Sequence, residues 1–87
     1  MTDLPTARLK RLMFQSTHRG MKETDLLLGG FAHDCLGGLD AGQLDRFEAL
    51  LDQSDADLYD WITGKRPVPA DFDHDVMALL QTRKDAL

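Results

Sequence analysis

The chain has 87 residues, of which 43% are hydrophobic and 29% are charged, and its formal net charge is −5. These fractions are ordinary for a soluble globular protein. The length predicts a single domain, residues 1–87, whose small core removes about 60 to 65% of the unfolded surface from water. The charge is uneven, because residues 1–22 carry a net +4 and residues 23–87 a net −9. Such an acidic body argues against a nucleic-acid partner, which requires a positive surface.

Cysteine content and hydropathy predict where the protein works. Cys35 is the only cysteine, which excludes an intramolecular disulfide and favours a reducing compartment. The sequence has no apolar run long enough to span a bilayer, and its start lacks the apolar segment of a secretory signal. We therefore expect a cytoplasmic protein that does not insert into membranes. We also expect it to be bacterial and monomeric.

Apolar residues at helical spacing predict a first helix that ends near Thr17. Thr2 or Asp3 can cap its start, and Pro5 falls in the first turn, where a missing N–H costs nothing. The residues expected on its apolar side are Leu9, Leu12, Met13 and Ser16.

A second helix is predicted from Met21 to about Leu36, and its buried side is expected to carry Leu27 or Leu28, Phe31 and Cys35. Gly29 and Gly30 lie in its middle, where each glycine costs about 1 kcal/mol relative to alanine. A helix that keeps two glycines is expected to pack tightly against another helix at that point.

Capping residues predict the third and fourth helices. Gly37 and Gly38 end the second helix, and Asp40 with Gln43 fits a capping box for the third. The third helix is expected to bury Leu44, Phe47, Leu50 and Leu51. Ser54 can cap a fourth helix, Asp55 to Thr63, which buries Leu58, Trp61 and Ile62 and ends at Gly64.

An extended linker is predicted at residues 64–70, because each of its two prolines biases the preceding residue away from the α region. Asp71 or Asp73 is expected to open a C-terminal helix at about residues 71–84, with Phe72, Val76, Leu79 and Leu80 directed inward and Arg83 and Lys84 at its end. The chain has no strand signal. The sequence therefore predicts an all-α fold, a compact five-helix bundle.

The turn Arg19-Gly20-Met21-Lys22-Glu23, called the corner below, joins the basic first helix to the apolar second one. A glycine at this point can adopt φ > 0 or let another surface approach the backbone. The Arg19 guanidinium is expected to reach outward, and Glu23 falls where the helix dipole favours an anion. An Arg19–Glu23 pair is the plainer interpretation, but that order is the weaker one on a helix and exposed pairs contribute little. A rigid recognition corner explains the cluster better.

No metal or catalytic site is predicted. His33 and Cys35 lie two residues apart, so their side chains diverge on a helix, and the other two histidines, His18 and His74, fall in other elements. The serines Ser16 and Ser54 lack a histidine at an activating spacing. The sequence therefore favours a binding module over an enzyme.

Tyr59 is a further candidate contact residue. It lies off the buried side of the fourth helix, whereas Trp61 shares that side with Leu58 and Ile62. Exposed aromatic residues and arginines are enriched at interface hot spots, so Tyr59 is predicted to contact a partner protein.

Residues 11–20 (RLMFQSTHRG) and 21–28 (MKETDLLL) resemble the FAD assembly factor family, which includes the SdhE type and the succinate dehydrogenase assembly factor 2 type of mitochondria. The family signature is Arg-Gly-x-x-Glu, commonly continuing Met-x-Glu-x-Asp. Residues 47–51 and 55–62 are similar to the third and fourth helices of that family, so the resemblance covers about residues 8–66. One departure is His18, which stands where the family often has a second basic residue.

The resemblance implies a five-helix chaperone, not an enzyme, that binds the flavoprotein subunit of succinate dehydrogenase or fumarate reductase. It also implies that this protein promotes covalent attachment of FAD to the subunit, and that FAD belongs to this client rather than to the chain. The residues implied as client contacts are Arg19, Gly20 and Glu23 at the centre, with Arg11, Met21 and Asp25 beside them. The alternative is a helical protein-binding adaptor or regulatory module with a different client.

Overall fold

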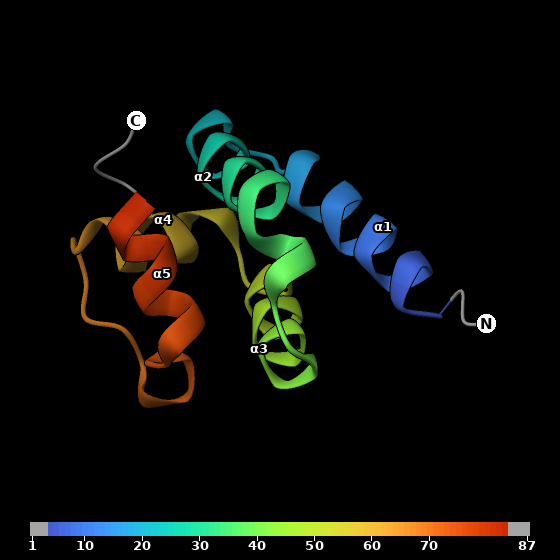
Figure 1. Cartoon of the computed structure of the whole chain (residues 1–87). Coiled ribbons are helices and arrows are strands. Elements are labelled where there is room, and N and C mark those ends of the chain that lie inside the picture. The colour runs from blue at the N-terminus through green and yellow to red at the C-terminus, as the bar shows by residue number, and fades with distance from the viewer. Residues whose placement is uncertain (1–3, 84–87) are drawn as a thin grey trace.

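The computed structural model describes residues 4–83, and the side chains of residues 7–83. This part of the chain contains five α-helices, two short 3-10 helices and no strand, which confirms the all-α prediction. The α-helices are α1 (Leu4–Thr17), α2 (Lys22–Cys35), α3 (Ala41–Leu51), α4 (Asp55–Thr63) and α5 (Asp75–Arg83). Figure 1 shows α1 and α5 on opposite sides of the molecule, with α2 and α3 between them. The proposed caps Thr2 and Asp3, and the terminal Lys84, lie outside the described residues.

Helices α1 and α2 pack closely because Gly29 carries no side chain. A Cβ atom at Gly29 would lie 3.2 Å from Cγ2 of Thr17 and 3.6 Å from the Ser16 carbonyl oxygen. The predicted tight packing against the glycine pair is therefore confirmed at Gly29. Gly30 instead lies beside α5, where a Cβ atom would be 3.1 Å from an Nη atom of Arg83.

The core lies between α2, α3, α4 and α5, and α1 packs against it through α2 and α3. Phe31 of α2 and Phe47 of α3 are fully buried, with ring centroids 5.3 Å apart. Trp61 of α4 is 6% exposed and stacks on Phe72, which confirms its predicted place in the core. Leu12 and Ser16 of α1 are fully buried, whereas Leu9, Met13 and Cys35 are partly buried against the core.

Local capping also follows the predictions. Asp40 and Gln43 form both hydrogen bonds of a capping box at the start of α3. The Ser54 side chain accepts a hydrogen bond from the Asp57 N–H at the start of α4. Gly64 ends α4 in the left-handed conformation at φ 84°, which costs glycine little because it has no Cβ.

The start of the last helix was predicted wrongly. Residues Ala70–Phe72 form a 3-10 helix, η2, and α5 begins only at Asp75, with the His74 Nδ1 accepting a hydrogen bond from the Met77 N–H. Leu79, expected inward, is 42% exposed, and Met77 is buried in its stead. At about 100° per residue, Leu79 lies well outside the stripe that Val76, Met77 and Leu80 form on α5.

Candidate functional site

The backbone of the corner is fixed by hydrogen bonds to one carboxylate, that of Asp55 at the start of α4. Its Oδ1 accepts a hydrogen bond from Arg19 Nε at 2.7 Å. Its Oδ2 accepts from the backbone N–H of Gly20 at 2.6 Å and of Met21 at 3.0 Å. The backbone of the corner is therefore tied to a helix that lies 34 to 36 residues further along the chain.

Arg19 connects the corner to the end of α3 as well. Its Nη1 donates to the Leu51 carbonyl at 2.7 Å, and its Nη2 donates to the Gln53 carbonyl at 2.8 Å. The last carbonyls of a helix have no partners within the helix and carry partial negative charge, so a cation is favourable there. One guanidinium thus bonds three acceptors around the α3–α4 turn.

The expectation that the Arg19 guanidinium reaches outward is therefore wrong. The side chain is only 10% exposed and its Nε, Nη1 and Nη2 atoms all have partners inside the molecule. The plainer interpretation, a pair between Arg19 and Glu23, is wrong too, since Arg19 pairs with Asp55. The sequence offered several carboxylates at similar distances, so it could not single out a partner 36 residues away.

The structure gives a different reason to expect a glycine at position 20 from the one that the sequence suggested. Among the described residues only Gly64 has a positive φ, so Gly20 has no left-handed backbone. A Cβ atom on Gly20 would instead lie 3.1 Å from Asp55 Oδ2. A side chain at this position would press on the carboxylate that holds the corner, and the Gly20 N–H bond to that oxygen would have to lengthen.

The electrostatics of Asp55 fit its role as an acceptor. Partial burial alone would raise the pKa of this carboxyl group. The hydrogen bond and charge of Arg19, with the N–H groups of Met21 and Gly20, outweigh burial and bring the pKa below its usual value. Asp55 is therefore ionised near neutral pH, which is the form that accepts all three hydrogen bonds.

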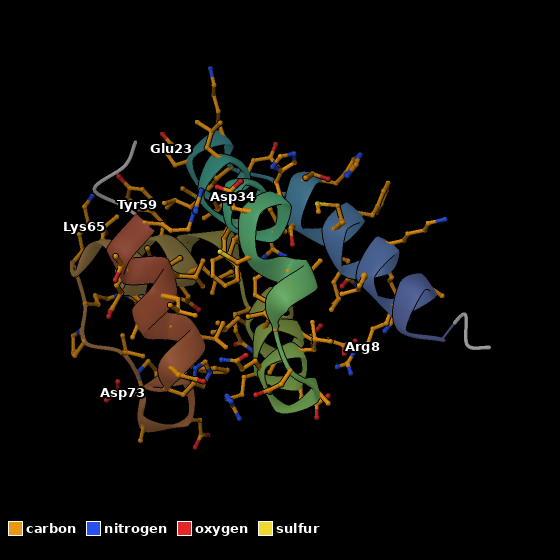
Figure 2. The ribbon with its side chains drawn as sticks, viewed as in Figure 1. Arg8, Glu23, Asp34, Tyr59, Lys65 and Asp73 are labelled. Atoms are coloured by element: carbon orange, nitrogen blue, oxygen red, sulfur yellow. The ribbon has the colours of Figure 1, made fainter. Side chains whose placement is uncertain are left out.

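The outer side of the corner carries the groups that a partner can reach. Glu23 is exposed at the start of α2, and no ion pair among residues 7–83 involves it (Figure 2). Gly20 and Lys22 are also exposed, and Met21 is partly buried. Asp25 faces inward instead, since its Oδ1 accepts from the Arg19 N–H at 3.4 Å.

The other two predicted contact residues have partners outside the corner. Arg11 is half exposed on α1 and its Nη2 lies 3.4 Å from Glu48 of α3. Tyr59 is partly buried on α4, with the Lys65 amino group 5.2 Å from its ring centroid (Figure 2). The structure therefore brings together Arg19, Gly20, Met21, Glu23 and Asp25, and no hydrogen bond or ion pair found among residues 7–83 joins Arg11 or Tyr59 to them. Whether any of these residues binds a partner stays a prediction.

Sequence reasoning missed two kinds of residue at this site. Asp55 was assigned only a helix-dipole role, although an arginine in a turn needs an acceptor and Asp55 opens a neighbouring helix. Phe14 and Leu26 were not singled out, yet they are 60% and 53% exposed in the last turns of α1 and the first turns of α2. The signal for Phe14 was its place off the apolar side formed by Leu9, Leu12, Met13 and Ser16.

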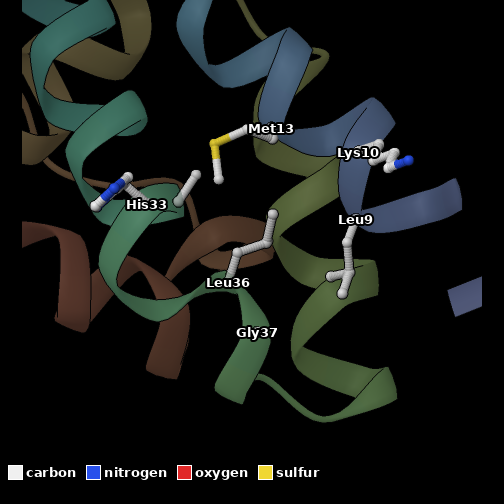
Figure 3. A pocket seen from close by; sticks show the side chains of 7 residues that line it. Leu9, Lys10, Met13, His33, Leu36 and Gly37 are labelled. Carbon is white, nitrogen blue, oxygen red and sulfur yellow. The ribbon is translucent and has the colours of Figure 1, made fainter. Parts of the chain in front are cut away.

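A groove of about 360 Å³ lies at the other end of the α1–α2 pair. Figure 3 shows Leu9, Lys10 and Met13 of α1 on one side and His33, Leu36 and Gly37 on the other. Within the described residues, no group of three or more His, Cys, Asp or Glu side chains could hold a metal ion. No helix in that same part of the chain is long and apolar enough to cross a membrane.

The fold and the corner define a small all-α domain that displays the turn between its first two helices. The chain belongs to the family described as the flavinator of succinate dehydrogenase, whose model matches residues 10–84. The resemblance inferred from the corner and the α3–α4 segments is therefore confirmed.

Curated relatives agree with the family match. The chain is 44% identical over 72 residues to a mitochondrial succinate dehydrogenase assembly factor 2 of Dictyostelium discoideum, which covers 83% of this chain and 51% of that protein. It is 41% identical over 80 residues to the mitochondrial succinate dehydrogenase assembly factor 2-B of Drosophila mojavensis, and this match covers 90% of this chain and 51% of that protein. For the mitochondrial factor 2 of Mycosarcoma maydis the identity is 43% over 67 residues, with 77% and 28% covered. The chain thus spans about half the length, or less, of these three relatives.

Proposed function

We propose that this protein is an assembly factor that binds the flavoprotein subunit of succinate dehydrogenase or fumarate reductase and promotes its covalent flavinylation. The observation that carries the proposal is the family match over residues 10–84, which includes the complete corner. The names of three relatives, all succinate dehydrogenase assembly factors, support the same client. Those relatives are named mitochondrial, and a bacterial cytoplasmic location for this chain stays a prediction.

In this proposal the protein selects a conformation of its client and is not itself an enzyme. FAD and the accepting histidine belong to the client and supply the chemistry. The chain holds no FAD of its own and acts as a monomer. A partner that binds one conformation more tightly shifts the client toward it. The rigid corner, with Gly20, Lys22 and Glu23 exposed on its outer side, is the surface that would make this contact.

The proposed order of events is as follows. The protein binds an unassembled, FAD-loaded flavoprotein and holds flavin and histidine in alignment, so that the covalent bond forms by self-catalysis. It then leaves when the iron–sulfur subunit docks on the flavoprotein. A small interface suits this cycle, because transient complexes bury less surface than permanent ones.

Co-expression with a client tests the proposal. The flavoprotein subunit is produced in a host that lacks its own assembly factor, with and without this chain. We expect covalent flavin, seen as fluorescence of the flavoprotein band after denaturing electrophoresis, only when the chain is present. The flavoprotein should also co-purify with the tagged chain.

The matched control replaces an exposed acid far from the corner. Figure 2 shows Glu23 near the top of the view and Asp73 near the bottom. Glu23→Ala should reduce covalent flavin, and Asp73→Ala should not. Equal flavinylation with and without the chain would contradict the proposal, and capture of an unrelated protein in its place would favour an adaptor with another client.

A further inference from the structure

Asp55 and Asp57 are close neighbours in sequence but have different partners. Both lie in the first turn of α4. Asp57 pairs with Arg66 at the surface, where the side chains are 42% and 49% exposed. Asp55 is 16% exposed and all three of its donors, Arg19, Gly20 and Met21, belong to the corner. The carboxylate of Asp55 therefore serves the corner alone.

We infer that Asp55 is the positioning residue of the corner, acting through Arg19 and through the Gly20 and Met21 N–H groups instead of touching the client. The inference rests on the proposed function for the client's identity, but its structural part concerns this chain alone. It assigns Arg19 an internal role as well. The client then contacts the outer side of the corner, and Arg19 and Asp55 determine the backbone conformation of that surface.

The shape of the arginine side chain is essential in this arrangement. Nε, Nη1 and Nη2 of Arg19 bond three different acceptors, on Asp55, Leu51 and Gln53. A lysine has the same charge but a single nitrogen, so it cannot reproduce this planar fork. If Arg19 acted by presenting charge to the client, lysine would replace it adequately. If it acts internally, lysine should fail.

Both carboxylate oxygens of Asp55 are essential too. Oδ1 accepts from Arg19, and Oδ2 accepts from Gly20 and Met21. Asparagine has the same shape but only one acceptor oxygen, with an NH₂ donor in the other place. Asp55→Asn therefore leaves either the guanidinium or the two N–H groups facing a donor. The substitution hardly changes the volume of the side chain, but it removes hydrogen bonds that fix the backbone of the corner.

The first experiment needs no client. Amide hydrogen exchange is measured by NMR for the parent, Asp55→Asn and the matched control Asp57→Asn. We expect the Gly20 and Met21 amides to exchange at least about tenfold faster in Asp55→Asn, with buried amides of α2 unchanged. Asp57→Asn should leave both corner amides as in the parent. Equal exchange of the corner amides in Asp55→Asn and the parent would overturn the inference.

The second experiment measures binding to the flavoprotein subunit well below the melting temperature of each variant. Asp55→Asn and Arg19→Lys should each weaken binding at least about tenfold. The double variant should bind no more weakly than the worse single variant, because both changes disrupt one unit. Losses that multiply in the double variant, or parental binding by Arg19→Lys, would show that Arg19 contacts the client itself.

Gly20→Ala supplies a readout that a general folding defect would not produce. The added Cβ presses on Asp55 Oδ2, so the substitution should weaken binding by a larger factor in the parent than in an Asp55→Ala background. An equal loss in both backgrounds would contradict the inference. If the parent itself binds no flavoprotein, the proposed function fails, and the exchange experiment still decides whether Asp55 holds the corner.

Discussion

Two arginine–aspartate pairs in this molecule share their chemistry and differ in burial. Asp55 and Asp75 are the first residues of α4 and α5. Asp55 accepts from Arg19 and from two backbone N–H groups. Asp75 accepts two bonds from Arg46, one from the Gln43 side chain and one from the backbone N–H of the next residue, Val76. The Arg19–Asp55 side chains are 10% and 16% exposed, and those of Arg46 and Asp75 are 39% and 48% exposed.

The comparison separates the strength of a contact from its importance. The hydrogen bonds of Arg46 and Gln43 lower the pKa of Asp75 to about 2, so its contacts are well formed. Water can replace them, however, and exposed ion pairs contribute little net stability. Water has little access to the Arg19–Asp55 pair. Loss of Asp55 leaves the guanidinium of Arg19 without its carboxylate and two N–H groups without an acceptor, and loss of Arg19 leaves the carboxylate of Asp55 without its cation. Burial, and hydrogen bonds to the backbone of a segment distant in sequence, distinguish the corner, whereas the ion pair itself does not.

The largest loss of stability is expected from a change in the core, and it serves as a reference for the two ion pairs. Trp61→Ala removes a side chain that is 6% exposed and stacked on Phe72. We expect the free energy of unfolding to fall by about 3 to 5 kcal/mol, measured by urea denaturation. A variant that unfolds like the parent and loses only client binding would place Trp61 in an interface.

The next largest effect separates the two pairs directly. Arg19→Ala should lower the free energy of unfolding by about 2 to 3 kcal/mol, because Asp55 and two carbonyls lose a charged donor. The matched variant Arg46→Ala should change it little, since its partner stays hydrated. Urea denaturation of both variants gives the comparison. Equal losses would show that burial does not distinguish these pairs.

Acid should reveal both pairs, because both aspartates have a pKa below the usual value. A lowered pKa stabilises the folded state above the unfolded pKa, about 4, and this contribution is lost as pH falls through the folded pKa. We expect the melting temperature to be steady from pH 7 to 5 and to fall toward pH 2. Asp75→Asn should make that fall shallower, and Asp73→Asn serves as the exposed control. An unchanged acid slope in Asp75→Asn would contradict the expectation.

The smallest effect on stability is expected at the outer side of the corner. Glu23→Ala removes an exposed carboxylate from the first turn of α2, which should cost less than about 1 kcal/mol of stability. Client binding should nevertheless weaken measurably by calorimetry. Parental affinity in this variant would exclude Glu23 from the contact.

Sequence reasoning predicted the fold well because its signals are local. Helix ends at Thr17 and Thr63, the capping box at Asp40 and the left-handed Gly64 each depend on residues within a few positions. The family was also predicted from three short segments, residues 11–28, 47–51 and 55–62. The start of α5 is an exception. Asp71 and Asp73 were both expected to cap this helix, but the side chain that accepts from its first turn is His74.

The construction of the corner could not be predicted, because its contacts are distant in the chain. Arg19 bonds acceptors 32 to 36 residues away, and its charge alone suggested an outward position. Gly20 was expected to let a partner surface approach its backbone, whereas the group that lies close to it within the chain is the carboxylate of Asp55. Only the packing of α3 and α4 against the first two helices decides between these possibilities.

The guanidinium of Arg19 also couples the stability of the corner to that of the α3–α4 turn, because it bonds carbonyl groups there. Coupling between two sites is reciprocal, so a client that orders the corner must stabilise the distant turn by the same free energy with which that turn favours binding. Amides around Gln53 and Ser54 should therefore exchange more slowly with solvent when the flavoprotein is bound, without any contact to it. The reporter of client binding then lies outside the corner, at a turn about thirty residues further along the chain.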